Sequence, residues 1–400
     1  MMRRNRPPSI LPHLLWVDNL SATDSLPVTS RFEVTRELRK LDWHVTLVLA
    51  GSSGQQFIRC TEVLCISKPQ LFFFGYCMFH LRLLRLLAYE WTNIDVILFP
   101  QMVAPWVLPL RLVRRLRGMR RPLLVMDIRD LHAPARDFDV AGLHLKNRLK
   151  VLFDNFAHRL ANRWADGQTA ITQRMVDLVQ IPSQHLWGTW PSGVNLVSFA
   201  PAQADRRWPL PGEPIHLVYI GELLHERNLL PLCQAVEEAN ATGMTFILSL
   251  IGDGESRVDL ERFALQTAGR IRVISPVPHD QIPEWLAQAH IGVTSIFHTD
   301  QELFQASSPI KLFEYMAAGL PILGTRSACH TDVVGNGEYA FWVEKADVSG
   351  LLAALRLVWQ NRDSLSKMGS HAAIASQAWT WQESARKLKA ALEYGMVKQH

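Results

Sequence analysis

The segment Ser307-Ser-Pro-Ile-Lys-Leu-Phe-Glu-Tyr-Met-Ala-Ala-Gly-Leu-Pro-Ile322 combines a lysine and a carboxylate at helical spacing. Lys311 and Glu314 are three residues apart, so on a helix they share one face. We expect the hydroxyls of Ser307 and Ser308 to cap this helix, whose free N–H groups favour a bound phosphate. The lysine and the helix N-terminus would then hold phosphates, while the carboxylate accepts hydrogen bonds from ribose hydroxyls. The alternative is an ordinary capped helix with a solvated Lys–Glu pair.

Two strand candidates that end in glycine precede this segment. Leu217-Val-Tyr-Ile-Gly221 is followed by Arg227 at the entry of the next helical pattern, and Ile251-Gly-Asp-Gly254 ends a second strand candidate. A glycine at a strand end lets the backbone come close to a ligand, and Arg227 adds positive charge where helix N–H groups are free. Each turn taken alone is at least as consistent with a tight turn that binds nothing.

Apolar strand-like runs alternate with helical patterns along most of the chain, which is typical of βαβ units and parallel sheets. The strand candidates are residues 14–18, 44–50, 57–66, 95–100, 123–129, 167–172, 216–220, 245–251, 272–274, 291–295 and 321–324. We expect helices at 30–41 and from about residues 228, 258, 280 and 308. A stretch without periodicity, 201–214, separates two such series. The sequence therefore predicts an α/β protein with two Rossmann-like, doubly wound domains.

Charge is unevenly distributed between the two halves of the 400-residue chain. Residues 1–200 contain 25 Lys and Arg against 15 Asp and Glu, whereas residues 201–400 contain 17 against 22. The basic first half predicts an anionic partner there. The five scattered cysteines lack metal-ligand spacing and favour a reduced, cytosolic chain. The most hydrophobic run, 71–79, is about half as long as a bilayer-spanning helix, so we expect no transmembrane segment.

Taken together, these segments resemble glycosyltransferase family 4, a family of retaining enzymes with the GT-B fold. The shared features are the glycine-ended strand with a following basic residue (Gly221 and Arg227), the Gly-Asp-Gly turn at 252–254, and a helix that runs into Ala-x-Gly-x-Pro at 317–321. The resemblance implies two Rossmann-like domains that face each other across a cleft. It predicts an N-terminal, acceptor-side domain at 1–195, a hinge at 196–214 and a donor domain at 215–378. A C-terminal helix at 379–400 would cross back to the N-terminal domain.

Weaker likenesses extend this resemblance over nearly the whole chain. Pro191-Ser-Gly-Val-Asn195 is similar to the family's hinge entry, and Trp379-Thr-Trp381 to the start of its closing helix. Asp127-Ile-Arg-Asp-Leu131 resembles a segment of a subgroup that builds cell-surface polysaccharides. The likeness is strongest from about 215 to 385.

The resemblance implies roles for individual residues. Glu314 would bind the ribose of a nucleoside-diphosphate-sugar, Arg227 would contact its diphosphate, and Ile310 would offer a backbone N–H to the phosphates. Base recognition is expected mainly through the backbone around 275–278. From the other domain, Arg129 and Asp130 would orient the transferred sugar or the acceptor.

Three positions depart from the family's pattern. Ala306 stands where the family has a glutamate that contacts the donor sugar, and Glu222 stands where an arginine is usual. Pro309 removes one amide that would otherwise face phosphate. Lys311 and the hydroxyls of Ser307 and Ser308 are the expected substitutes.

The implied reaction needs no protein nucleophile, because the leaving diphosphate itself helps to remove the acceptor proton. Arg227, Lys311 and the helix end at 307–308 would stabilise the charge on the leaving group. We expect no essential metal and no cofactor besides the nucleotide-sugar co-substrate. A different arrangement with His132 or His158 as a base stays open.

The acceptor side of the chain is basic and apolar. The segment 106–121 carries six arginines, and positions 111, 114, 115 and 118 share a helical face. Such a helix fits docking on an anionic membrane leaflet, with a glycan or lipid-linked saccharide as acceptor. The alternative is a solvated helix face in a basic protein. We expect a cytoplasmic chain, peripheral on the membrane, and no nucleic-acid partner.

Other functions compete with this hypothesis. Ala306 and Glu222 favour a catalytically silent nucleotide-sugar-binding or assembly subunit. A sugar-nucleotide epimerase or a phosphorylase would share two Rossmann-like domains, but the segment 307–322 speaks against both. A nicotinamide dehydrogenase is the weakest alternative, since no Gly-x-Gly-x-x-Gly follows any strand candidate.

Overall fold

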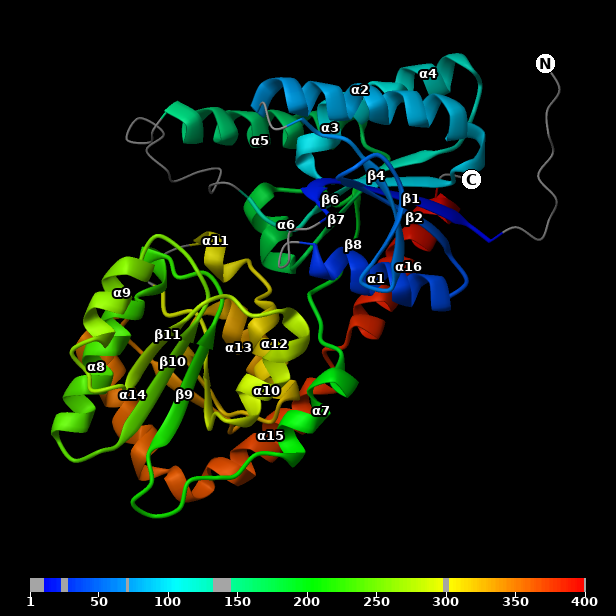
Figure 1. Cartoon of the computed structure of the whole chain (residues 1–400). Coiled ribbons are helices and arrows are strands. Elements are labelled where there is room, and N and C mark those ends of the chain that lie inside the picture. Colours follow the sequence, from blue (N-terminus) through cyan, green and yellow to red (C-terminus); the bar gives the residue numbers. More distant parts are fainter. Residues whose placement is uncertain (1–10, 23–27, 70–71, 132–144, 298–301, 399–400) are drawn as a thin grey trace. The chain divides into compact units, whose positions relative to one another are not determined.

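The computed structural model describes residues 11–22, 28–69, 72–131, 145–297 and 302–398. The chain divides into two compact units: unit 1 is Met1–Pro191 with Trp381–His400, and unit 2 is Ser192–Thr380. Each unit is a mainly parallel sheet between layers of helices (Figure 1). The predicted α/β class with two Rossmann-like domains is confirmed. None of the helices in the described part of the chain has both the length and the apolar character needed to cross a bilayer.

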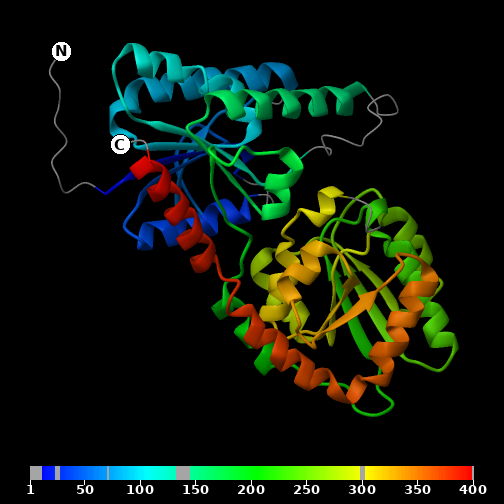
Figure 2. The same ribbon diagram turned by 180° about the vertical axis from the view of Figure 1, so that it is seen from behind.

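Unit 1 is built on an eight-stranded sheet in the order β3-β4-β2-β1-β5-β6-β7-β8. Its strands are β1 (His13–Ser21), β2 (His44–Ala50), β3 (Gly54–Ile58), β4 (Thr61–Ile66), β5 (Val96–Phe99), β6 (Leu123–Ile128), β7 (Gly167–Ala170) and β8 (Leu186–Thr189). One face carries α2 (Phe72–Glu90), α3 (Ala104–Val107), α4 (Leu110–Leu116) and α5 (Leu145–Trp164) (Figure 1). The other face carries α1 (Thr29–Lys40) and α16 (Trp381–Lys398), the last helix of the chain, which packs on α1 and β8 (Figure 2).

Unit 2 has a six-stranded sheet in the order β11-β10-β9-β12-β13-β14, with every neighbouring pair parallel. Its strands are β9 (Ile215–Ile220), β10 (Phe246–Ile251), β11 (Ile271–Ile274), β12 (Ile291–Val293), β13 (Ile322–Thr325) and β14 (Ala340–Val343). The helices that matter below are α7 (Leu196–Ala204), α8 (Leu229–Ala241), α9 (Arg257–Ala264), α12 (Ile310–Ala317), α14 (Val348–Gln360) and α15 (Leu365–Ser376).

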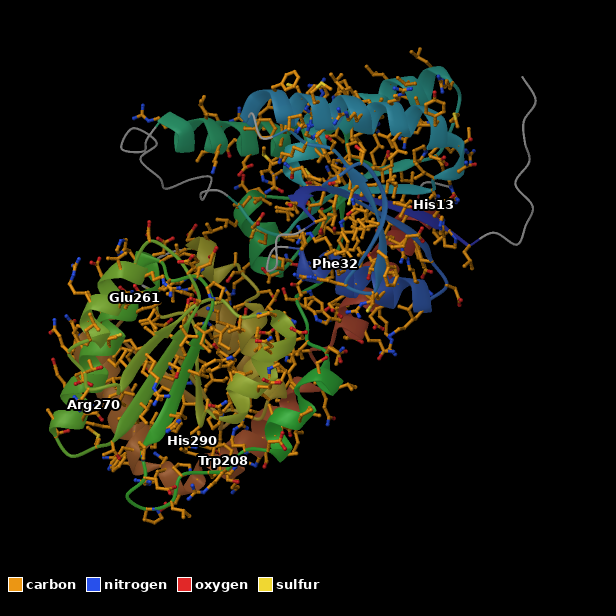
Figure 3. The ribbon with its side chains drawn as sticks, viewed as in Figure 1. His13, Phe32, Trp208, Glu261, Arg270 and His290 are labelled. Atoms are coloured by element: carbon orange, nitrogen blue, oxygen red, sulfur yellow. The ribbon has the colours of Figure 1, made fainter. Side chains whose placement is uncertain are left out.

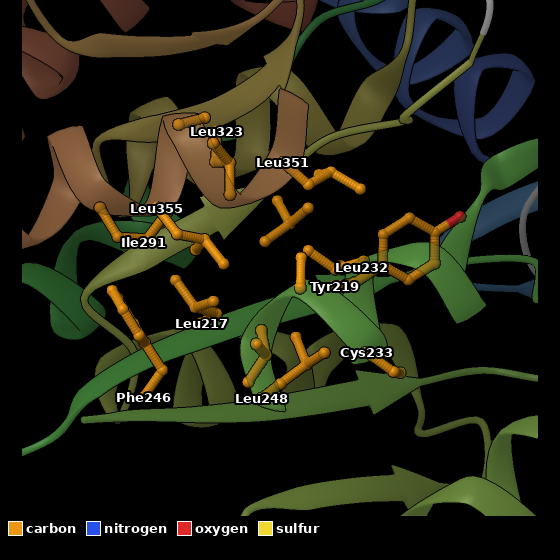
Figure 4. Close-up of a cluster of buried hydrophobic side chains, with 14 of the residues drawn as sticks. Leu217, Tyr219, Leu232, Cys233, Phe246, Leu248, Ile291, Leu323, Leu351 and Leu355 are labelled. Carbon is orange, nitrogen blue, oxygen red and sulfur yellow. The ribbon is translucent and has the colours of Figure 1, made fainter. Parts of the chain in front are cut away.

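The central strand β9 is buried on both faces, as its run of apolar residues requires. Side chains alternate along a strand, so Leu217 and Tyr219 pack against α8 and α14, while Val218 packs into the cluster on the opposite face. Figure 4 shows the first cluster, which includes Leu217, Leu248 and Leu355. This two-sided core fixes the strand ends, and with them the loops that follow β9 and β12.

The amino-terminal edge of the unit 2 sheet is closed by packed rings. Trp208 stacks on His290 with ring centroids 6.1 Å apart, and Figure 3 labels both at that end of the unit. His290 Nδ1 accepts a hydrogen bond from the His216 N–H, and its Nε2 donates to the Arg207 carbonyl, each at 3.0 Å. This pairing requires the neutral ring. Burial is the largest cause that lowers the pKa of His290 to about 4.

Acid is therefore expected to destabilise unit 2 through His290. An unfolded histidine titrates near 6.5, so between pH 6.5 and 4 the unfolded chain binds a proton that the folded chain does not. At pH 4.5 this coupling removes about 2 kcal/mol of the stability present at pH 7. Urea unfolding at pH 7 and at pH 4.5 measures this effect. Between these pH values, the free energy of unfolding of the His290→Gln variant should fall by about 2 kcal/mol less than that of the wild type. An equal loss in both proteins would contradict this assignment.

The expected single strand at 57–66 is wrong. The structure has a hairpin instead, in which β3 and β4 pair antiparallel and Ile58 faces Thr61. Arg59 and Cys60 form its turn, with φ angles of +47° and +57°. Neither residue type favours this backbone region, so the turn carries no glycine or asparagine signal. Strands β8 and β14 also lie outside the expected set.

The segment expected as a hinge is more ordered than its composition indicates. Residues 196–204 form α7, which belongs to unit 2 and contacts α12. Asn195 caps this helix by accepting from the Val197 N–H. The unit boundaries fall at Pro191/Ser192 and Thr380/Trp381. Pro201 lies inside the helix. Because proline usually interrupts helices, its presence in the sequence argued against a helix here.

Candidate functional site

The strand order of unit 2 changes direction between β9 and β12. From β9 the chain proceeds outward to β10 and β11, and β12, β13 and β14 follow on the other side. Leu217 pairs with Ile291 across this junction. Ligands of doubly wound sheets bind outside the carboxyl ends of the strands at such a switch point, because the flanking loops separate there.

Arg227 lies at this switch point. It ends the short 3-10 helix His225–Arg227 that follows β9. Its Nη1 donates to Ser295 Oγ after β12 at 3.2 Å, and its Nη2 lies 4.0 Å from a Glu222 carboxylate oxygen. Its guanidinium also lies over the Phe304 ring, 4.8 Å from the centroid. The predicted phosphate-binding arginine is thus held between the ends of β9 and β12, with a carboxylate at long range.

Lys311 comes to the same place from the first turn of α12. Its Nζ lies over the Tyr219 ring, 3.9 Å from the centroid. A β-carbon on Gly221 would lie only 2.6 Å from that Nζ, so the glycine makes room for the ammonium group. Burial is the first cause, and the Arg227 charge the second, that lower the pKa of Lys311 to about 7. Two cations thus share the site, which favours an anion of high charge.

The glycine turns pack against each other, backbone to backbone. Gly221 has φ +144° and Gly252 has φ +155°, a region that side chains disfavour. A β-carbon on Gly252 would lie 1.8 Å from the Gly221 carbonyl oxygen. These glycines are therefore required by local packing as well as by any ligand.

Glu314 is held by a residue that sequence reasoning missed. The carboxylate is 6 % exposed, and its Oε1 lies 2.7 Å from His279 Nε2. His279 begins the turn after the loop 275–278, and its ring lies 6.2 Å from that of Phe199. In the sequence, the available sign of this role was the position of His279 directly after the loop 275–278, which we expect to contact the base. The pair leaves one carboxylate oxygen of Glu314 for other partners.

The two serines before α12 do not cap it, so this expectation is wrong. Pro309 is the N-cap residue and makes no side-chain cap hydrogen bond. Ser308 Oγ accepts from the Ser192 N–H at 3.0 Å, and Ser307 Oγ donates to the Phe304 carbonyl at 2.7 Å. The fixed φ of proline holds Pro309 in extended geometry and delays the helix to Ile310. The Ile310 N–H therefore lies in the first turn, as a phosphate donor would require.

The candidate residues of unit 1 lie at the carboxyl end of β6. Arg129 is 7 % exposed; its guanidinium lies 3.5 Å from the Trp190 ring centroid and donates to the Trp190 carbonyl at 2.7 Å. Burial is the largest cause that lowers the pKa of Arg129 to about 9. Asp130 is exposed, and its carbonyl accepts from Gln101. His158 is buried within α5, and His132 lies outside the described residues.

Two of the three departures from the family's pattern concern side chains whose exposure the structure shows. Ala306 is 1 % exposed, so its position holds no polar group for a ligand. The Glu222 side chain is 64 % exposed and directed mainly to solvent. Its charge is consequently screened, which reduces its repulsion of an anion.

Comparison with known proteins identifies the part of the chain that holds these residues. Residues 214–361 match the family described as glycosyl transferases group 1. The matched region includes Gly221, Arg227, Lys311, Glu314 and His279, and it covers most of unit 2.

Two curated proteins are similar to this chain over part of its length. A 2-deoxystreptamine glucosyltransferase of Streptomyces kanamyceticus is 29 % identical over 43 % of this chain and 46 % of its own length. A candidate colanic acid biosynthesis glycosyltransferase, WcaL, of Salmonella typhimurium is 24 % identical over 41 % of this chain and 39 % of its own. The chain therefore matches less than half the length of either relative.

Solved structures of glycosyltransferases share the fold over nearly the whole chain. Sucrose-phosphate synthase of Thermosynechococcus elongatus has a TM-score of 0.70 at 14 % identity, covering 94 % of this chain and 97 % of its own. Anabaena HepE in complex with UDP-glucose has a TM-score of 0.69 at 14 % identity, covering 95 % and 99 %. Starch synthase IV of Arabidopsis thaliana, bound to ADP and acarbose, scores 0.71 at 11 % identity, covering 97 % and 100 %. The chain has the GT-B fold, as the sequence predicted.

Proposed function

We propose that this chain is a retaining glycosyltransferase that moves a hexose-type sugar from a nucleoside-diphosphate-sugar to a glycan or lipid-linked saccharide. The observation that carries the proposal is the convergence of Arg227 and Lys311 on the switch point between β9 and β12. Glu314, whose carboxylate is held by His279, lies in the same matched region and would accept hydrogen bonds from the ribose hydroxyls. UDP-glucose in the HepE structure and ADP in the starch synthase structure support this class of donor.

The proposed step exchanges one bond for another at the anomeric carbon. The bond from that carbon to the diphosphate oxygen breaks, and a bond to the acceptor hydroxyl oxygen forms on the same face. The acceptor proton passes to the departing diphosphate. Arg227 and Lys311 stabilise the negative charge that develops on the leaving oxygen, while Arg129 and Asp130 orient the sugar or the acceptor. The step requires no divalent metal and no further cofactor.

A transfer assay tests the proposal. The purified chain is incubated with radiolabelled UDP-, GDP- or ADP-sugars and a bacterial lipid extract that contains polyprenyl-linked saccharides, in buffer with a chelator. We expect label to enter the lipid fraction from one donor, and the product to keep the anomeric configuration of that donor in its NMR spectrum. An inverted product would reject the retaining mechanism, and transfer that stops in the chelator would reject metal independence.

A second function is favoured by the buried Ala306, which removes a sugar-binding carboxylate from the expected position. A catalytically silent nucleotide-sugar-binding subunit would bind the donor without releasing its nucleoside diphosphate. Donor binding with no transfer to any fraction of the extract would replace the first proposal by this one. With either function, we place the protein in cell-surface polysaccharide or glycolipid synthesis, on the cytoplasmic face of the membrane.

A further inference from the structure

The helical layer formed by α2, α3, α4 and α5 in unit 1 is strongly cationic. The segments 74–93, 104–121 and 148–164 that contain its described side chains hold twelve arginines and lysines against two carboxylates, Glu90 and Asp154. Asp154 is 3 % exposed, so it neutralises little of the surface charge. The positive excess of the first half of the chain is thus concentrated on one layer of unit 1.

Only part of this positive charge is used in buried ion pairs within unit 1. Arg114 is buried and binds both carboxylate oxygens of Asp166, at 2.6 and 2.7 Å. It does not belong to an exposed stripe, and the predicted face at 111, 114, 115 and 118 is wrong in this respect. The helix α4 also ends at Leu116, before Gly118. Arginines that remain exposed come from three helices and the loop after α4: Arg85, Arg115, Arg117, Arg120, Arg159 and Arg163.

Large apolar side chains are exposed among these arginines. On α5 they are Leu149 and Leu152, each 58 % exposed, and Phe156, 54 % exposed. Their spacing of three and four residues places them in one row on the helix. Leu116 on α4 is 88 % exposed and Leu81 on α2 is 53 % exposed. None of the described residues of unit 1 covers these atoms, and apolar patches of this kind mark interaction surfaces.

The three helices form one continuous surface. Tyr76 of α2 meets Phe153 of α5 edge to face, with ring centroids 6.3 Å apart. Arg111 Nη1 of α4 donates to the Arg163 carbonyl near the end of α5 at 3.2 Å. The short helix α3 contacts α2, α4 and α5, and all four lie on the same face of the sheet (Figure 1).

We propose that this surface, the exposed side of α2, α4 and α5, binds an anionic lipid bilayer without spanning it. The row of Leu149, Leu152 and Phe156 would enter the boundary between headgroups and acyl chains, and the exposed arginines would contact anionic headgroups. A nucleic acid would match the charge but not the exposed leucines, since its backbone offers no apolar surface to them. This proposal rests on the proposed function, because it identifies the surface of unit 1 through which such an enzyme would contact the membrane. Membrane binding itself is tested without a donor or a turnover assay.

Vesicle flotation tests this proposal on the full chain. The wild type should float with vesicles of phosphatidylglycerol and phosphatidylcholine, and much less with phosphatidylcholine alone. Replacing both Arg115 and Arg117 by Glu should lower the partition coefficient by about thirtyfold or more, because each arginine near an anionic surface contributes roughly fivefold. The double variant Leu152→Glu and Phe156→Glu should abolish flotation.

Matched variants in unit 2 serve as controls. Leu265 is 87 % exposed and the Arg262 side chain 70 % exposed, so Leu265→Glu and Arg262→Glu make the same chemical changes away from this surface. Both controls should float like the wild type, and all variants should keep the wild-type circular dichroism spectrum. Equal losses in the controls would overturn the proposal.

Other occupants of the surface give distinct results. Absence of flotation with anionic vesicles, accompanied by binding to single-stranded DNA, would overturn the proposal in favour of a nucleic acid. A dimer in sedimentation velocity that dissociates in the Leu152→Glu variant, without flotation, would overturn it in favour of a second copy of the chain. Loss of nucleotide binding or transfer has no bearing on these outcomes, so failure of the proposed function is recognised separately.

Discussion

Replacing Lys311 with Met is expected to lower kcat about a hundred- to a thousandfold, as the removal of one group that stabilises a developing anion does elsewhere. The ammonium group lies between the Tyr219 ring and Gly221, close enough to Arg227 for the two charges to interact. KM for the donor should rise much less, because the charge on the leaving oxygen appears only in the transition state. Steady-state kinetics with the donor identified by the transfer assay measures both quantities.

The same lysine should couple donor binding to protonation. The pKa of Lys311 is about 7 in the free protein, so its charge is lost as pH rises through neutrality. A bound diphosphate stabilises the charged form and raises this pKa, so binding takes up protons near and above pH 7 and weakens towards pH 9. Calorimetry in buffers of different ionisation enthalpy measures this uptake.

Two variants separate this role from a general effect on folding. Lys311→Arg keeps a charge at every pH tested, so it should retain part of the affinity and lose the proton uptake. Lys367→Met removes an exposed lysine from α15 in the same unit and should change neither kcat nor proton uptake. Unchanged uptake in Lys311→Arg would show that another group titrates.

Replacing Glu314 with Ala is expected to weaken nucleoside-diphosphate binding by about ten- to a hundredfold, since it removes hydrogen bonds from a carboxylate to ribose hydroxyls. The effect should be confined to ligands that carry those hydroxyls. A 2′,3′-dideoxynucleoside diphosphate should bind the wild type weakly and the variant equally weakly. A variant that loses affinity for both ligands to the same extent would indicate a structural role for Glu314.

His279 should act only through Glu314. The distance of 2.7 Å between His279 Nε2 and Glu314 Oε1 fixes the carboxylate, so His279→Ala should lower affinity for the ribose ligand several-fold. In the Glu314→Ala background the same change should have no effect, which a double-mutant cycle measures. Recovery of affinity in His279→Gln would support orientation by a hydrogen bond, and independent effects of the two changes would contradict it.

Local spacing predicted only the part of the candidate site whose residues are close in sequence. Lys311 and Glu314 lie on one helix of eight residues, where a separation of three fixes a common face. Gly221 and Gly252 follow buried strands, and their positive φ angles explain why glycine occurs there. The parallel α/β class followed from apolar runs of strand length between helical patterns.

Features that depend on distant residues were not predictable. His279 and Glu314 are 35 residues apart, and they meet only in the folded chain. Arg114 looked like part of a surface stripe because its partner, Asp166, lies 52 residues further along the chain. The turn at Arg59 and Cys60 is imposed by the pairing of β3 with β4, against the preference of both residue types.

The most direct test of the account is binding of UDP, GDP, ADP, CDP and TDP to the wild type and to the double variant Arg227→Ala and Lys311→Ala. A matched control, Arg262→Ala with Lys367→Ala, removes two exposed cations of unit 2 that lie outside the site. We expect one nucleoside diphosphate to bind preferentially, and its affinity to fall at least about a hundredfold in the double variant but not in the control. Binding that is equal in the three proteins, or absent from all of them, would contradict the assignment of the donor site.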